Sequence, residues 1–295
     1  MPIVMLLNMK GGVAKTTTAV ALAECLASQG YETLLIDADH QNMAGELLLG
    51  EARLLQTEKR RRTLYDLLAV MLDDTFSSAH LDEYVAPEAS NIAGGLPLLS
   101  VLPCSMRIDD FSTNMAKARK GHLSNQEFLK QFNKRKRQLK RWLVNEFDYT
   151  IIDCPPALSI QVKFLLSVAD SFIIPTIPDR LSVRGSLYLM DRLSRSKYTI
   201  TGLGTLWSLY REQNAVHRYM VAATERGFEP FNQLPDPFET IIPNATKIAQ
   251  AADIDEIEPS SFRSKYTHRF AELYEDLVAE MLERLETVEA PATAG

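Results

Sequence analysis

The segment Asn8-Met-Lys-Gly-Gly-Val-Ala-Lys-Thr-Thr-Thr18 stands between an apolar stretch, residues 3–8, and a segment of helical character, residues 17–28. This order of strand, glycine-containing loop, Lys-Thr and helix is what a phosphate-binding loop requires, because backbone N–H groups wrap the phosphates and the helix N-terminus adds positive potential. The common pattern G-x-x-x-x-G-K-[ST] is not met, since Met9 and Ala14 occupy its two glycine positions. A chance Gly-Gly turn before a helix is the alternative, and the strand and helix context favours phosphate binding.

Two side chains of this loop carry the chemistry that phosphate binding needs. Lys15 would reach the β- and γ-phosphates of a nucleotide, and the Thr16 hydroxyl would bind Mg²⁺. The sequence therefore predicts a nucleotide and Mg²⁺ at the start of the first helix.

Short apolar, β-branched runs alternate with longer segments of helical periodicity along the 295 residues. Several runs are apolar nearly throughout, as expected for a parallel sheet with both faces covered by helices. The alternation predicts an α/β fold with a doubly wound, mostly parallel, twisted sheet of about seven or eight strands flanked by helices. The strand candidates are residues 3–8, 33–37, 96–102, 149–153, 171–177, 201–209 and 238–242.

The domain organisation follows from the same alternation. Residues 1–288 are expected to form a single domain, within which residues 53–147 make an enlarged, basic and helical region. The tail, residues 289–295, is expected to be disordered. A basic run occupies residues 59–62, and the long helical stretch 125–145 contains another. On that stretch the spacing places Leu129, Phe132, Leu139 and Leu143 on one face and Lys130, Lys134, Arg137 and Arg141 on the opposite face.

The overall composition limits the classes of function. The 32 Lys and Arg against 38 Asp and Glu give a net charge of −6, so nucleic-acid contact would need a local basic patch. The basic face of the stretch 125–145 is either a solvated outer face or a surface for an anionic partner.

No apolar run approaches the ~20 residues of a membrane span, and the first Lys follows the apolar N-terminal stretch, unlike a secretion signal. Three widely spaced cysteines fit a reducing cytoplasm.

The loop Lys10-Gly-Gly-Val-Ala-Lys-Thr16 resembles the deviant Walker A motif of the ParA/MinD family of P-loop ATPases, in which a second lysine precedes the glycine pair. Further segments resemble family motifs in the family's order, so the resemblance runs from about residue 3 to residue 250. They are the switch segment Leu34-Leu-Ile-Asp-Ala-Asp-His-Gln41, the Walker B segment Asp148-Tyr-Thr-Ile-Ile-Asp-Cys-Pro-Pro156, the segments Ala169-Asp-Ser-Phe-Ile-Ile-Pro175 and Val183-Arg-Gly185, and the adenine loop Phe238-Glu-Thr-Ile-Ile-Pro-Asn244.

The resemblance implies ATP and Mg²⁺ as cofactors and gives individual side chains roles. Lys10 would reach the ATP of a second subunit, so two ATP molecules would lie in a homodimer that forms only with ATP. Asp39 would orient the attacking water, and Asp37 and Asp153 would hold Mg²⁺ together with Thr16; helix capping or a turn is the alternative for Asp37 and Asp39. The implied ATP contacts are Lys10, Gly11, Gly12, Val13, Ala14, Lys15, Thr16, Thr17, Pro243 and Asn244.

The chain departs from the family's pattern at three places. Ala14 replaces a glycine, and a left-handed backbone there would cost about 1 kcal/mol. His40 replaces the proline of D-x-D-P-Q, and residues 53–145 are longer and more basic than in the short family members. None of these changes removes a group that the chemistry needs.

Two branches of the family are disfavoured by the sequence. The membrane branch uses a C-terminal amphipathic helix, but the polar face of residues 266–285 is acidic, so anionic lipid would repel it and no membrane partner is expected. The iron-protein branch needs cluster-binding cysteines, and the surroundings of Cys104 and Cys154 do not match that pattern.

A ParA-type (Soj-like) DNA-partitioning ATPase is therefore the leading interpretation, cytoplasmic and nucleoid-associated. The resemblance implies slow ATP hydrolysis stimulated by a ParB-like centromere-binding or adaptor protein, and non-specific binding to the DNA backbone. The alternatives are a nucleoid-based ATPase that positions a cargo other than DNA, and an ATP-timed regulatory switch that binds an acidic protein. The candidate DNA contacts are Lys134, Arg137, Arg141, Arg211, Arg218, Lys247, Arg263, Lys265 and Arg269.

Overall fold

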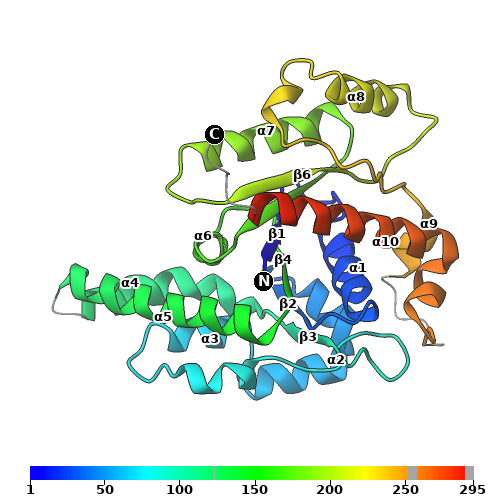
Figure 1. Cartoon of the computed structure of the whole chain (residues 1–295). Coiled ribbons are helices and arrows are strands. Elements are labelled where there is room, and N and C mark those ends of the chain that lie inside the picture. Colours follow the sequence, from blue (N-terminus) through cyan, green and yellow to red (C-terminus); the bar gives the residue numbers. More distant parts are fainter. Residues whose placement is uncertain (122–123, 252–257, 290–295) are drawn as a thin grey trace.

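The computed structural model describes residues 1–121, 124–251 and 258–289, and at its centre lies a sheet of six parallel strands (Figure 1). The strand order is β3-β2-β4-β1-β5-β6, so the chain winds outward in both directions from the middle of the sheet. This arrangement is the doubly wound α/β fold that the sequence predicts. The strands are β1 (Ile3–Leu6), β2 (Thr33–Asp37), β3 (Leu99–Leu102), β4 (Tyr149–Asp153), β5 (Ser171–Thr176) and β6 (Thr201–Trp207).

Helices cover both faces of the sheet (Figure 1). The α-helices are α1 (Lys15–Ser28), α2 (Met43–Lys59), α3 (Leu64–Val70), α4 (Phe111–Gly121), α5 (Asn125–Glu146), α6 (Ile160–Leu166), α7 (Arg180–Ser194), α8 (Ala215–Glu225), α9 (Thr246–Gln250) and α10 (Phe262–Glu289). Short 3-10 helices lie at η1 (Ser78–Tyr84), η2 (Met106–Asp110) and η3 (Phe231–Gln233).

The period-two alternation of β1 divides its side chains between two separate cores. Val4 and Leu6 pack with α1, α2 and α10 on one face of the sheet. Ile3 and Met5 pack with α3, α5 and α6 on the other face. Because both faces are buried, the strand reads as a continuous apolar run in the sequence.

The three cysteines are buried thiols that form no disulfide. Cys25 belongs to the core on the α1 side, whereas Cys104 and Cys154 belong to the core on the opposite side. Burial raises the pKa of Cys25 to about 12 and also raises the pKa of the other two thiols.

Residues 238–242 were predicted to be a strand, and this prediction is wrong. The segment runs beside β6, and its Phe238 and Ile242 N–H groups donate to β6 carbonyls at 2.9 Å, but only isolated bridges form, from Pro237 to β6 and from Pro243 to Tyr210 beyond it. Proline has no N–H for a sheet ladder, and two backbone N–H groups inside the segment donate to the Glu280 carboxylate of α10. The described residues therefore form six strands instead of seven or eight.

The enlarged region 53–147 includes a helical hairpin. Helices α4 and α5 lie side by side and extend away from the sheet (Figure 1), and α5 confirms the helix predicted over residues 125–145. The helix predicted over 266–285 lies within α10, whose first turns are interrupted at Thr267, where φ is 61°. Of the predicted tail, residues 290–295 lie outside the described residues. In the described part of the chain, no helix has both the length and the apolar character to cross a bilayer.

Candidate nucleotide-binding site

The phosphate loop connects β1 to α1 through two residues with left-handed backbone. Gly12 has a φ of 71°, and Ala14 has a φ of 60° and a ψ of 31°. The Ala14 carbonyl accepts a hydrogen bond from the Thr18 N–H at 3.0 Å, so helix α1 starts directly from this strained residue. A left-handed conformation costs a non-glycine residue about 1–2 kcal/mol. The backbone of Ala14 is therefore strained, as expected where alanine replaces a glycine with a left-handed conformation.

Lys15 lies inside this loop. Its side chain is buried, and its Nζ donates to the Lys10 carbonyl at 3.1 Å. Burial lowers the pKa of the Lys15 ammonium, while the carboxylates of Asp153 and Asp39 act in the opposite direction. The ammonium is thus at the centre of the loop, where phosphate oxygens would be stronger partners than a carbonyl.

Thr16 and Asp153 meet across the site as a close pair. The Thr16 hydroxyl donates to Asp153 Oδ2 at 2.6 Å, while Asp153 Oδ1 is buried with no hydrogen-bond partner among the described residues. Burial raises the pKa of Asp153 to about 7. An orphaned carboxylate oxygen beside a hydroxyl is a donor set that suits a hard divalent cation such as Mg²⁺. The residues present therefore fit Mg²⁺.

Asp37 lies opposite Asp153 in the register of β2 and β4, but its oxygens are differently engaged. They accept the backbone N–H groups of Asp39 and Gly45, each at 3.0 Å. Burial, followed by the nearby Asp153 charge, raises the pKa of Asp37 well above its usual range. Both contacts are those of a residue that caps a turn and a helix start, which was the alternative interpretation of Asp37. A role of Asp37 in holding Mg²⁺ stays a prediction.

Asp39 lies two residues after the end of β2. Its Oδ1 accepts the Gln41 N–H at 3.1 Å, which closes a local turn, and it also lies 3.6 Å from His40 Nδ1. The Asp39 side chain is 16% exposed. Its carboxylate acts on the pKa of the Lys15 ammonium, in the direction opposite to burial, and its part in orienting the attacking water stays a prediction.

Lys10 does not point into its own phosphate loop. Its Nζ lies 3.2 Å from Asp179 Oδ2 and 3.4 Å from Asp179 Oδ1, at the N-terminus of α7. Both side chains are about one-third exposed, at 30% and 33%. Lys10 is therefore at the surface beside the site, where a second subunit could reach it.

The candidate adenine loop is hydrogen-bonded to residues that follow β6. Asn244 N–H donates to the Tyr210 carbonyl at 2.8 Å, and the Asn244 carboxamide oxygen, oriented to satisfy both groups, accepts two bonds of 2.8 Å from Arg211. Pro243 is half-buried and Asn244 is exposed. These bonds fix the loop but leave its contact with adenine a prediction.

Two residues that organise the phosphate loop were missed by sequence reasoning. The Asn8 side chain is buried; it accepts the Lys10 N–H at 2.9 Å and donates to the Pro175 carbonyl at 2.7 Å. The Ser208 hydroxyl, after β6, donates to the Val13 carbonyl at 3.0 Å. Asn8 could have been found in the sequence, because it is a polar residue at the end of an apolar run. The sequence contains no comparable signal for Ser208.

Helix α5 presents four cations along its exposed side: Lys130, Lys134, Arg137 and Arg141, here called the α5 cation row. The row spans about 16 Å at 1.5 Å per residue. Within the described part of the chain, none of the four forms an ion pair. The opposite face is buried at Phe128, Leu139, Trp142 and Leu143, but Leu129, predicted to lie there, is 47% exposed and is corrected to a surface residue.

The C-terminal candidates for DNA contact are mostly engaged within the protein. Lys265 is wrong as a DNA contact, because its side chain is 2% exposed and forms a buried ion pair with Glu24. The Arg263 side chain pairs with Glu275 at 2.7 Å, and Arg218 donates to a backbone carbonyl at 2.6 Å. Lys247 and Arg269 are exposed.

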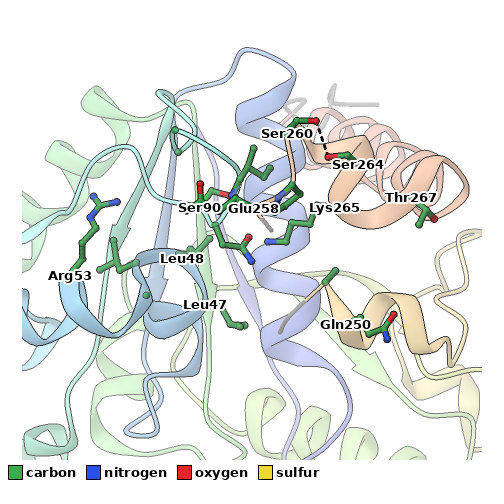
Figure 2. A pocket seen from close by; sticks show the side chains of 18 of the residues that line it. Leu47, Leu48, Arg53, Ser90, Gln250, Glu258, Ser260, Ser264, Lys265 and Thr267 are labelled. Carbon is green, nitrogen blue, oxygen red and sulfur yellow. Dashed lines mark hydrogen bonds between the residues drawn. The ribbon is translucent and has the colours of Figure 1, made fainter. Parts of the chain in front are cut away.

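A cavity of about 810 Å³ lies between α2 and the α9–α10 region, and Figure 2 shows side chains that line it. Arg53 and Ser90 line one side, and Lys265 and Ser264 line the other. None of its described lining residues belongs to the phosphate loop, so this cavity is separate from the nucleotide site.

The comparisons with known proteins agree with this geometry. A family model described as an AAA domain matches residues 1–202, more than half of the chain. The chain is 31% identical over 198 residues to the chromosome partitioning protein ParA of Myxococcus xanthus, covering 67% of the chain but only 57% of the relative. The chain belongs to the ParA/MinD family of P-loop ATPases.

Two further similarities extend over nearly the whole chain. The sporulation initiation inhibitor protein Soj of Bacillus subtilis is 26% identical over 288 residues, covering 95% of this ParA/MinD chain and 97% of the relative. A solved structure of cobyrinic acid a,c-diamide synthase from Mycobacterium smegmatis, with bound ADP and magnesium, aligns with a TM-score of 0.65 and 24% identity, over 97% and 96% of the two chains. At that identity the structural likeness shows the fold alone.

Proposed function

We propose that this chain is a Mg²⁺-dependent partitioning ATPase that dimerises around two ATP molecules, binds DNA non-specifically and segregates a plasmid or chromosome. The observation that carries the proposal is the Thr16–Asp153 pair, with its orphaned carboxylate oxygen, beside the buried Lys15 ammonium. The relatives named as partitioning proteins support the cargo.

Each side chain of the site has a distinct task in this proposal. The Lys15 ammonium would bind the β- and γ-phosphates. Thr16 and Asp153 would hold Mg²⁺, and Asp37 would assist them. When bound, Mg²⁺ supplies positive charge that offsets the charge on the transferred phosphoryl group. Asp39, near the loop, would orient the attacking water. Pro243 and Asn244 would contact adenine.

Lys10 would complete the site of the partner subunit. Its side chain lies outside its own loop and is partly exposed, which is the placement that action across an interface needs. A cation supplied in trans stabilises the charge of the phosphoryl-transfer transition state. Hydrolysis would therefore require the dimer. Because the dimer is held by ATP, hydrolysis would also cause the two subunits to separate.

The DNA contact would be made by the α5 cation row, with Arg211, Arg218, Lys247, Arg263 and Arg269 as further candidates. Exposed cations without base-reading motifs favour contact with phosphates, independent of sequence. Two rows in one dimer would act together, and linkage raises avidity by about 10²–10⁴ over a single site. A ParB-like or adaptor protein would stimulate hydrolysis, and the protein would reside in the cytoplasm on the nucleoid.

The test separates ATP binding from dimerisation. We expect Lys15→Ala to lose ATP binding, measured by equilibrium dialysis, because it removes the principal charge on the phosphates. We expect Lys10→Ala to bind ATP as a monomer but to lose ATP-dependent dimerisation in sedimentation, and to bind DNA only weakly. Lys163→Ala, an exposed lysine on α6, is the control and should behave as the parent. Normal ATP affinity in Lys15→Ala, or a normal dimer in Lys10→Ala, would refute the proposal.

A further inference from the structure

We infer that Asp179 holds Lys10 within its own subunit and thereby restrains ATP-dependent dimerisation. The inference rests on the proposed function, in which Lys10 acts on the partner's ATP. It assigns a role to a residue that the sequence motifs did not single out. Asp179 is a positioning residue, since it acts through Lys10.

The contact is made by both oxygens of one carboxylate. Lys10 Nζ lies 3.2 Å and 3.4 Å from the two Asp179 oxygens. The Lys10 ammonium can occupy only one place at a time. While it is paired with Asp179 it cannot also contact a nucleotide bound to a second subunit. Dimerisation through Lys10 therefore requires this ion pair to break.

Asp179 is fixed where it stands, so it cannot follow Lys10 across an interface. It is the N-cap of α7, and its Oδ1 accepts the Ser182 N–H at 2.7 Å. Helix α7 in turn lies against Lys10: a Cβ added at Gly185 would be 3.6 Å from Lys10 Cβ and 3.9 Å from the Lys10 backbone nitrogen. Although burial acts against ionisation, the cap N–H and the Lys10 ammonium together hold the pKa of Asp179 below its usual range. The restraining group is thus a charged carboxylate at neutral pH.

The expected size of the restraint is modest, because both side chains are partly exposed. A pair of this kind changes an equilibrium by about 2- to 5-fold. The restraint would shift the ATP concentration at which half of the subunits dimerise without changing how tightly a single subunit binds ATP.

Asp179→Asn is the decisive variant. Asparagine is as good an N-cap as aspartate, so the helix start is kept while the negative charge that pairs with the Lys10 ammonium is lost. We expect sedimentation across an ATP titration to show half-dimerisation at about 2- to 5-fold lower ATP than in the parent. Asp191→Asn is the matched control, because it breaks the Asp191–Arg195 ion pair at the C-terminal end of α7, whereas Asp179 caps the N-terminal end.

A double-mutant cycle shows whether the effect passes through Lys10. In a Lys10→Ala background, Asp179→Asn should change neither ATP affinity, measured by equilibrium dialysis, nor the residual association of subunits. An unshifted or raised threshold in Asp179→Asn, or a shift equal to that of Asp191→Asn, would overturn the restraint while leaving the proposed function standing. A parent protein that does not dimerise with ATP would overturn both.

Discussion

Lys265 Nζ lies 2.7 Å from Glu24 Oε1 and 2.8 Å from Glu24 Oε2, inside the contact between α10 and the helix that starts at the phosphate loop. The Ser90 hydroxyl and the Tyr266 hydroxyl donate to the same carboxylate at 2.6 Å and 3.0 Å. The Lys265 and Glu24 side chains are 2% and 0% exposed. A buried carboxylate with this many donors is fully satisfied, so the C-terminal helix is tied to α1 by polar bonds as well as by packing.

Loss of one partner of this buried pair should be severe. Lys265→Met leaves the Glu24 carboxylate buried without a counter-charge, and we expect the free energy of unfolding to fall by about 3–5 kcal/mol. Urea unfolding followed by circular dichroism measures the change. Arg263→Met is the control, since its pair with Glu275 is exposed, and we expect little change there. Equal effects of the two substitutions would contradict the structural role of Lys265.

The raised pKa of Asp153 predicts a pH dependence of stability in the metal-free protein. The folded pKa is about 7, whereas an unfolded aspartate titrates near pH 4, so between these values the folded state keeps a proton that the unfolded state has lost. The contribution of Asp153 to stability should therefore fall as pH rises from about 4 to 7 and level off above. Thermal unfolding in a chelating buffer measures this, and Asp153→Asn should make the fall less steep, while the part that comes from the raised pKa of Asp37 remains. An unchanged slope in the variant would exclude Asp153 as its source.

The α5 cation row predicts a specific salt dependence. Each lost phosphate contact reduces the slope of log K against log salt by about 0.9, so the triple variant Lys134→Ala/Arg137→Ala/Arg141→Ala should reduce it by about 2 to 3 in DNA titrations with ATP. The triple variant Arg192→Ala/Arg195→Ala/Lys197→Ala removes the same charge from another exposed region and should leave the slope unchanged. Equal changes in both would show a general effect of net charge instead of a surface on α5.

Asp39 should matter for hydrolysis and not for binding. Asp39→Ala removes a carboxylate that has no direct contact with Lys15 among the described hydrogen bonds. We expect ATP affinity to stay near that of the parent while phosphate release stops and the dimer persists. A coupled phosphate assay and sedimentation measure the two effects. Turnover at the parent rate would move the water-orienting role to another residue.

The strained Ala14 predicts opposite effects of two substitutions. Ala14→Gly removes a strain of about 1–2 kcal/mol and adds unfolded-state freedom of about 0.4–1 kcal/mol, so stability should be unchanged or slightly higher. Ala14→Val adds a β-branched side chain to a left-handed backbone and should destabilise the protein. Thermal unfolding compares the three proteins. A valine variant as stable as the parent would mean that residue 14 has an ordinary right-handed backbone.

The sequence predicted the features that depend on local pattern. The apolar runs placed the six strands, and the loop around Lys15 predicted a candidate site, because strand, loop and helix are contiguous in the chain. The sequence missed features that depend on distant residues. Lys265 resembles a surface cation in sequence because its partner, Glu24, is 241 positions away. Asp179 lies 169 positions from Lys10, and the failed strand at 238–242 depended on the carboxylate of Glu280.

The separation of the core by the sheet gives each half of the molecule its own chemical reporter. Only a thiolate reacts readily with alkylating reagents, so buried thiols with raised pKa values react when the structure around them opens. Cys25 lies on the side of α1 and α10, and Cys104 and Cys154 lie on the other side. The rate at which each thiol is labelled therefore measures how often its own layer opens. Unequal rates would show that the two layers open independently, and equal rates that the sheet opens as one unit.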